Sequence, residues 1–119
     1  MKIKMSILAV LIFGSIYSTN AQQRRTVEER VKMSVTRMTD SLNLDKSQVE
    51  KSTVAMTDFY TSMDKMREGL APGTRPERSE MEKRMKSRDE QLSKILTTTQ
   101  MQKFKEMEER MRQERMQRQ

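Results

Sequence analysis

Beyond residue 21, glycine and proline occur in one short stretch only, residues 69–76. These two residue types are the strongest local breakers of regular structure. The sequence on either side is rich in Glu, Lys, Arg, Gln, Met and Leu, which favour the helical state. We therefore expect an all-α protein whose helices are separated near the middle of the chain by a single loop.

The first 21 residues have the pattern of a cleavable export signal. Two lysines precede an apolar run at residues 6–17, and small or polar residues follow, with Thr19 and Ala21 at the −3 and −1 positions before Gln22. The alternative is a permanent anchor, but a membrane-spanning helix needs about 20 apolar residues and this run is shorter. We predict a signal peptide at 1–21 and no stable membrane insertion after cleavage.

The chain contains no cysteine and no histidine. Stability in an oxidising compartment would then come from packing and not from disulfides. The usual metal ligands and most nucleophile–base pairs are also missing. No pair of carboxylates stands out among the 17 acidic residues as an acid and a base. We therefore expect no enzyme activity, no cofactor and no metal site.

Four segments carry signals for the start of a helix. Thr26, Asp45 and Thr97 are each followed three residues later by Glu or Gln, which is the pattern of a capping box. Pro76 is favoured in a first helical turn and is expected to open a further helix. The sequence thus predicts four helices within a domain at 22–110. The basic tail, residues 111–119, is expected to fray or be disordered.

Apolar residues recur at helical spacing in each of these segments. In the second segment two seams each repeat every seven residues, which is typical of coiled-coil-like packing. The stripes are Val27, Val31, Val35 (or Ser34), Met38 and Leu42; Val49, Met56, Met63 and Leu70 with Ser52, Phe59 and Met66; Met81, Met85, Arg88, Leu92 and Ile95; and Met101, Phe104, Met107 (or Glu108) and Met111.

A short pattern opens both the second and the fourth predicted helix. It reads Leu44-Asp45-Lys46-Ser47-Gln48 in one place and Leu96-Thr97-Thr98-Thr99-Gln100 in the other. The leucine can pack against the apolar face of the new helix, while the glutamine can bond back to the backbone of the capping residue. The pattern therefore fixes the angle at which the chain turns between two helices.

These two segments resemble the LTxxQ motifs of the Spy/CpxP-like periplasmic proteins. The second matches in full, and the first has Asp45 where the family has Thr, which preserves the capping role. The resemblance covers residues 27–108. It implies the periplasm of a Gram-negative bacterium. It also implies an elongated, thin cradle of four helices, built on a hairpin, that forms an antiparallel homodimer.

The resemblance leaves two functions open. Spy-like members are ATP-independent chaperones that hold unfolded or partly folded clients on a concave, positively charged surface with apolar patches. CpxP-like members also act as adaptors that restrain an envelope-stress sensor kinase in the membrane. Other relatives bind metal, but the absence of histidine and cysteine means that this role is not carried over.

Methionine is unusually frequent, with 13 in the chain. Most of these residues can be simple core residues, or they can form an adaptable apolar surface for varied clients. Binding of copper(I) is a third interpretation, but the spacing follows helical stripes and not tight clusters. The candidates for client contact are Met56, Tyr60, Met63, Met66, Met81, Met85, Arg84 and Arg88.

The net charge is +7, and it falls to +5 without the two lysines of the signal peptide. Mixed charges of this kind can be an ordinary solvated helix surface, or they can attract acidic clients at long range. Export argues against nucleic acid as the partner. The arginine-rich tail could touch anionic lipid, but its apolar face is too thin for firm binding.

Overall fold

The computed structural model describes residues 25–118, which form four α-helices and no β-strand. The helices are α1 (Val27–Leu42), α2 (Lys46–Glu68), α3 (Arg78–Ser93) and α4 (Thr98–Gln117). The prediction of an all-α protein with four helices is confirmed. The predicted signal peptide at 1–21 lies outside the described residues. No helix within residues 25–118 is long and apolar enough to cross a membrane.

Three of the four helix starts are capped as the sequence predicts. Thr26, Asp45 and Thr97 are extended, and their side chains accept hydrogen bonds from the backbone three residues later. The reciprocal bonds from the capping backbones to Gln48 and Gln100 are also present and complete two capping boxes, whereas Glu29 accepts from the hydroxyl group of Thr26 and not from its backbone. Each cap satisfies amide groups that a helix start otherwise leaves unpaired. The end of α1 is also set by a local conformation, because Asn43 takes a left-handed backbone conformation that ends the helix.

The third helix starts later than the sequence predicts. Its N-cap is Glu77, which makes no capping bond through its side chain, so α3 begins at Arg78 and not at Pro76. The fixed φ angle of proline suits an extended loop as well as a helical turn, and here it is used in the loop. The helix ends at Ser93, so Ile95 belongs to the turn that follows it.

The basic tail is helical, and the expectation of a frayed or disordered segment at 111–119 is wrong for the part that the structure describes. Helix α4 continues to Gln117. Side-chain pairs one helical turn apart support it, with Glu109 accepting from Arg112 and from Gln113. Such pairs stabilise the last turns of a helix even where few residues are buried.

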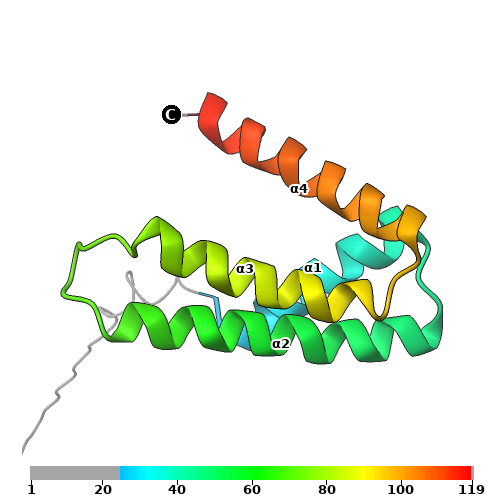
Figure 1. Cartoon of the computed structure of the whole chain (residues 1–119), viewed down its shortest axis with the longest axis horizontal. Coiled ribbons are helices and arrows are strands. Elements are labelled where there is room, and N and C mark those ends of the chain that lie inside the picture. The colour runs from blue at the N-terminus through cyan, green and yellow to red at the C-terminus, as the bar shows by residue number, and fades with distance from the viewer. Residues whose placement is uncertain (1–24, 119) are drawn as a thin grey trace, which may run out of the picture.

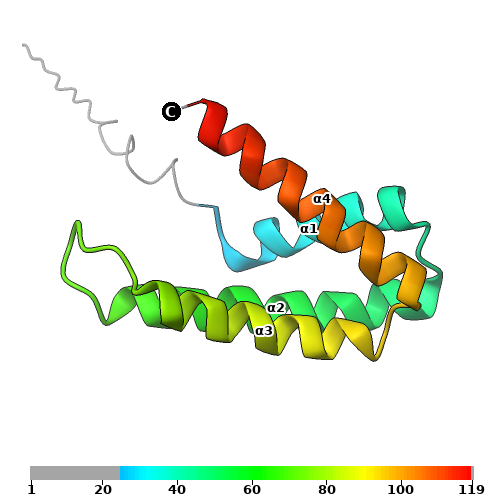
Figure 2. The ribbon, with the colours of Figure 1, turned by 45° about the horizontal axis from the view of Figure 1, so that its top comes forward.

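Helices α2 and α3 lie side by side and run in opposite directions, joined by the glycine- and proline-containing loop (Figures 1 and 2). Helix α1 also packs on α2. Helix α4 packs on α1 and on α3 near its own start and then diverges from the hairpin (Figures 1 and 2).

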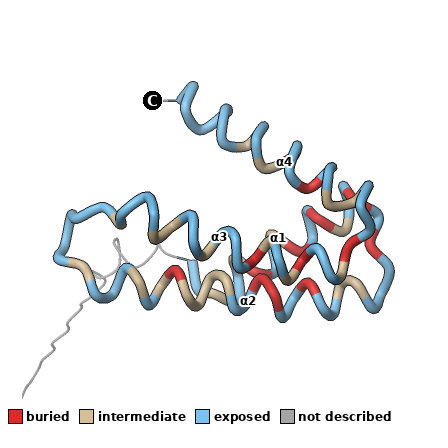
Figure 3. Tube along the Cα trace, viewed as in Figure 1, coloured by how far each residue is buried: buried red, intermediate tan, exposed pale blue. Residues whose placement is uncertain are grey.

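The buried residues gather at the end of the molecule where α1 turns into α2 and α3 turns into α4 (Figure 3). Leu44 and Leu96, the leucines that precede the two caps, are both buried in this core. Leu92 and Met38 are almost completely shielded from solvent. The two turns thus pack together in one core, while the opposite ends of the helices are more exposed.

Candidate functional site

A groove of about 650 Å³ is lined by residues from all four helices. Volumes of roughly 300–1,000 Å³ are typical of ligand-binding pockets. Methionine and arginine dominate the lining, with seven residues of each, so we call it the Met–Arg groove. Its lining residues are Arg25, Arg30, Ser34, Arg37, Met38, Met56, Phe59, Tyr60, Met63, Arg67, Met81, Met85, Arg88, Phe104, Met107, Glu108, Met111, Arg115 and Arg118.

The floor of the Met–Arg groove is apolar and buried. Five of its residues are less than a tenth exposed, and they come from three helices: Met38, Met56, Met63, Phe104 and Met107. Each lies on the apolar stripe of its helix, so the stripes of α1, α2 and α4 converge on one surface. Thioether side chains are flexible and polarizable, which suits a surface that adapts to differently shaped apolar groups.

The rim of the Met–Arg groove is cationic. Five arginines are exposed on it, and none forms an ion pair with another residue in the range 25–118: Arg25, Arg37, Arg67, Arg115 and Arg118. Glu108 is the only acidic residue of the described lining, and it is already paired with Arg88. The groove therefore combines an apolar floor with an unbalanced positive charge at its edge.

Arg88 lies between two aromatic rings near the start of α4. Its Cζ atom is 4.8 Å from the centroid of the Phe59 ring and 5.1 Å from that of Phe104. At these distances a guanidinium group is attracted to the ring faces. The residue is only 4% exposed. Its stacked position links α2, α3 and α4 at one point.

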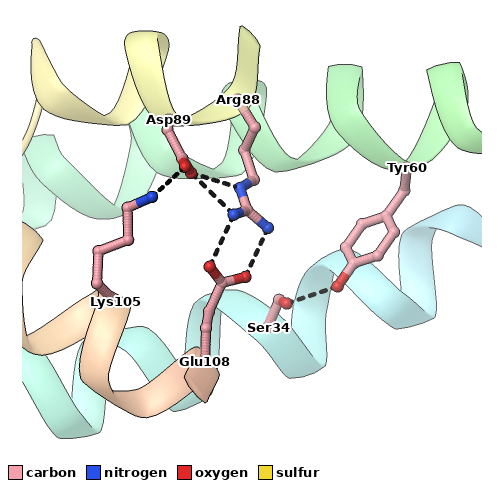
Figure 4. Close-up of polar contacts among 6 residues, drawn as sticks. All are labelled: Ser34, Tyr60, Arg88, Asp89, Lys105 and Glu108. Atoms are coloured by element: carbon pink, nitrogen blue, oxygen red, sulfur yellow. Dashed lines mark hydrogen bonds and ion pairs between the residues drawn. The ribbon is translucent and has the colours of Figure 1, made fainter. Parts of the chain in front are cut away.

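Carboxylates from two helices neutralise this buried guanidinium (Figure 4). Glu108 on α4 receives two bonds from Arg88, at 2.7 and 2.8 Å, in the forked geometry that arginine favours. Asp89 accepts two more bonds from Arg88 and also pairs with Lys105 of α4. The network joins α3 to α4 near the start of α4.

A second set of contacts holds α1 against α2 on the opposite wall. The hydroxyl groups of Ser34 and Tyr60 are 2.8 Å apart (Figure 4). The guanidinium of Arg30 lies 5.2 Å from the centroid of the Tyr60 ring and bonds Asp64 at 2.6 Å. Tyr60 therefore positions the wall of the groove and has its polar tip already satisfied.

The structure separates the predicted client-contact residues into groups. Met56 and Met63 are buried in the floor, and Arg88 is buried and paired with Glu108, so these three side chains expose little surface to solvent. The groove brings these residues together with Tyr60, Met81 and Met85, of which Met85 is 37% exposed. Two further candidates, Met66 and Arg84, do not line the groove.

Arg84 lies instead beside a smaller recess of about 370 Å³ between α2 and α3, together with Phe59 and Glu80. Its guanidinium bonds Glu80 one turn away at 2.8 Å. That hydrogen bond and the positive charge of Arg84 hold the pKa of the Glu80 carboxyl below its ordinary value. The pair is confined to α3 and has no part in the Met–Arg groove.

Sequence reasoning missed the rim arginines Arg37 and Arg67. Both lie off the apolar stripes, and in the sequence they are indistinguishable from the other charged residues of a solvated face. Which arginines line the groove depends on the direction in which α4 leaves the hairpin. The helical tail adds Arg115 and Arg118, which the sequence analysis marked only as a basic cluster.

The groove presents apolar side chains on its floor and positive charge on its rim. No group of three or more potential metal-ligating His, Cys, Asp or Glu side chains occurs within residues 25–118. Comparison of the chain with models of protein families, with curated proteins and with solved structures found no match.

Proposed function

We propose that this protein is a periplasmic, ATP-independent, holdase-like chaperone that binds unfolded or partly folded envelope proteins in the Met–Arg groove. The observation that carries the proposal is the composition of that groove, which pairs seven methionines with seven arginines. Unfolded chains expose apolar side chains that a folded protein buries, and a flexible thioether surface accepts many such shapes.

The two parts of the groove have separate roles in this mechanism. The unpaired rim arginines attract acidic segments of a client at long range, an effect that salt screens beyond about 10 Å at 0.1 M ionic strength. Apolar client side chains then enter the groove against the buried methionines and Phe104. Because the contacts are weak individually, the client can leave and fold without a nucleotide cycle.

The resemblance of the two capping turns to LTxxQ motifs supports the same proposal, and the second turn, at Leu96 to Gln100, matches in full. On that basis we also propose a homodimer in which the grooves of two protomers form a larger concave surface, the cradle that the resemblance implies. The proposed export fits a client pool of envelope proteins.

The test is an aggregation assay with several chemically denatured, unrelated clients at near-stoichiometric ratios of the purified protein. The expected result is suppressed light scattering that weakens as sodium chloride is raised. A rim variant should protect poorly while it keeps its helical content by circular dichroism; its three substitutions are Arg37→Gln, Arg67→Gln and Arg115→Gln.

A matched control removes the same charge away from the groove. This outer variant carries Arg75→Gln, Lys103→Gln and Arg110→Gln, all at exposed positions that do not line the Met–Arg groove and form no ion pair within residues 25–118. It should protect as well as the unmodified protein.

Absence of protection for every client would contradict the chaperone proposal. Binding to a single sensor ectodomain without general protection would instead favour the regulatory adaptor. Size-exclusion chromatography with light scattering on the same preparation tests the dimer.

A further inference from the structure

The Met–Arg groove is amphiphilic in cross-section. Its floor consists of buried methionines and Phe104, and its rim carries five exposed arginines with no carboxylate partner in the described part of the chain. A ligand that satisfies both parts needs an apolar body and an anionic group at one end. The volume of about 650 Å³ is that of a small-molecule pocket.

The floor offers little to a peptide backbone. Among the lining residues, the hydroxyl group of Ser34 is already bonded to Tyr60, and the carboxylate of Glu108 is already bonded to Arg88. A peptide group placed against the floor methionines and Phe104 would lose its hydrogen bonds to water and find no partner among those side chains, which is costly. An acyl chain has no such requirement, because it carries no donors or acceptors.

We propose that the Met–Arg groove is a binding site for monomeric anionic amphiphiles with a single acyl chain, such as a long-chain fatty acid. The chain lies along the methionine floor, and the anionic head reaches the rim, where guanidinium groups can bond a carboxylate in a bidentate manner. This goes beyond the proposed chaperone function and does not depend on it, because it concerns a small ligand bound in the absence of any client.

The test is isothermal titration of the purified protein with palmitate below its critical micelle concentration. Saturable binding with one site per protomer is expected. Shortening the acyl chain should weaken binding about fourfold for each buried methylene that is removed. Hexadecyltrimethylammonium has a chain of the same length with a cationic head, and it should bind at least about tenfold more weakly than palmitate.

The rim and outer variants separate a specific site from general charge attraction. The rim variant should lose about tenfold or more in palmitate affinity, whereas the outer variant, with the same net charge, should be unchanged. A further variant, Met85→Gln, alters a groove residue that is 37% exposed, so it should weaken binding without disturbing the core. Circular dichroism checks that each variant retains its helices.

Several results would overturn the proposal. Equal affinity for the cationic amphiphile, or equal losses in the rim and outer variants, would show that the groove does not recognise the anionic head. Binding seen only above the micelle concentration would show that an aggregate and not a single molecule is recognised. Binding only to phosphatidylglycerol vesicles, or only to an acidic amphipathic peptide, would assign the surface to a membrane or to a protein.

Discussion

The side-chain amides of Gln48 and Gln100 bond each other across the two helix junctions. Gln48 Nε2 donates to Gln100 Oε1 at 2.6 Å, and Gln100 Nε2 donates to Gln48 Oε1 at 3.2 Å. Each amide also donates to a carbonyl of the opposite junction, Gln48 to Ile95 and Gln100 to Leu42. The glutamine of each Leu-cap-x-x-Gln turn thus bonds both the capping residue of its own helix and the glutamine of the other turn.

Replacement of Gln100 by alanine should destabilise the fold by about 1–3 kcal/mol, because the substitution leaves polar groups at the joined turns without partners. Urea unfolding followed by circular dichroism measures the change. The control is Gln102→Ala, an exposed glutamine two residues further along α4, which should change stability by less than about 0.5 kcal/mol.

The pairing itself is tested by the double variant Gln48→Ala, Gln100→Ala. If the two amides act as one unit, the double variant loses clearly less stability than the sum of the single losses. Strictly additive losses would mean that each glutamine acts only as a cap of its own helix.

Replacement of Arg88 by methionine should lower the free energy of unfolding by about 3 kcal/mol, the low end for breaking a buried ion pair. The low end is expected because the Glu108 side chain is 29% exposed and keeps contact with water. Arg88→Lys should recover little of this loss, since an ammonium group cannot reproduce the forked bonds. The exposed pair of Arg78 and Glu82 supplies the control, and Arg78→Met should cost at most about 1 kcal/mol.

The same Arg88 variants test whether the network sets the position of α4. Spin labels at exposed sites near the ends of α2 and α4 should report a broader and shifted distance distribution in Arg88→Met. An unchanged distribution, together with unchanged stability, would show that the turn between α3 and α4 alone holds the helix in place.

Asp45→Thr, which completes the first LTxxQ motif, should leave stability within about 0.5 kcal/mol of the original, because both residues are good N-caps. Asp45→Ala should cost about 1 kcal/mol, and Thr97→Ala should cost a similar amount at the other turn. Thermal unfolding of the three variants measures the differences. A loss in Asp45→Thr as large as that in Asp45→Ala would show that the carboxylate has a role beyond capping.

The Glu80 carboxyl should titrate below its ordinary pKa, because its hydrogen bond to Arg84 and the charge of that residue favour the ionised form. The stabilisation from this pair is therefore complete above the ordinary pKa of a glutamate. It is lost as the pH falls through the lowered pKa. Carbon-detected NMR titration follows the Glu80 side chain, and Arg84→Gln should raise its pKa. An unaltered titration in that variant would contradict the assignment.

The helix boundaries were predictable wherever the signal was local. Thr26, Asp45 and Thr97 cap their helices because each needs only a backbone amide three residues away. The start of α3 was misplaced because Pro76 fits both a loop and a first turn. The tail is helical despite its scarcity of apolar residues, because pairs such as that of Glu109 and Arg112 stabilise its turns.

The candidate site was predictable only in part. The stripes identified Met56, Met63, Met81 and Met85, and the structure places all four around one groove. Periodicity shows which face of a helix is apolar, but it does not show how deeply a residue on that face is buried. It therefore could not distinguish the buried floor residue Met63 from the exposed Met85.

The helical class, the loop between α2 and α3 and the capped turns can be predicted from the sequence alone, because they depend on interactions within a few residues of the chain. The folded arrangement of the helices is needed to show that Gln48 meets Gln100, that Arg88 is buried between two rings, and that Arg37 and Arg67 share a rim with Arg115. These arrangements bring together residues that are 16 to 78 positions apart in the sequence. They follow from how four amphipathic helices pack, which local propensity does not specify.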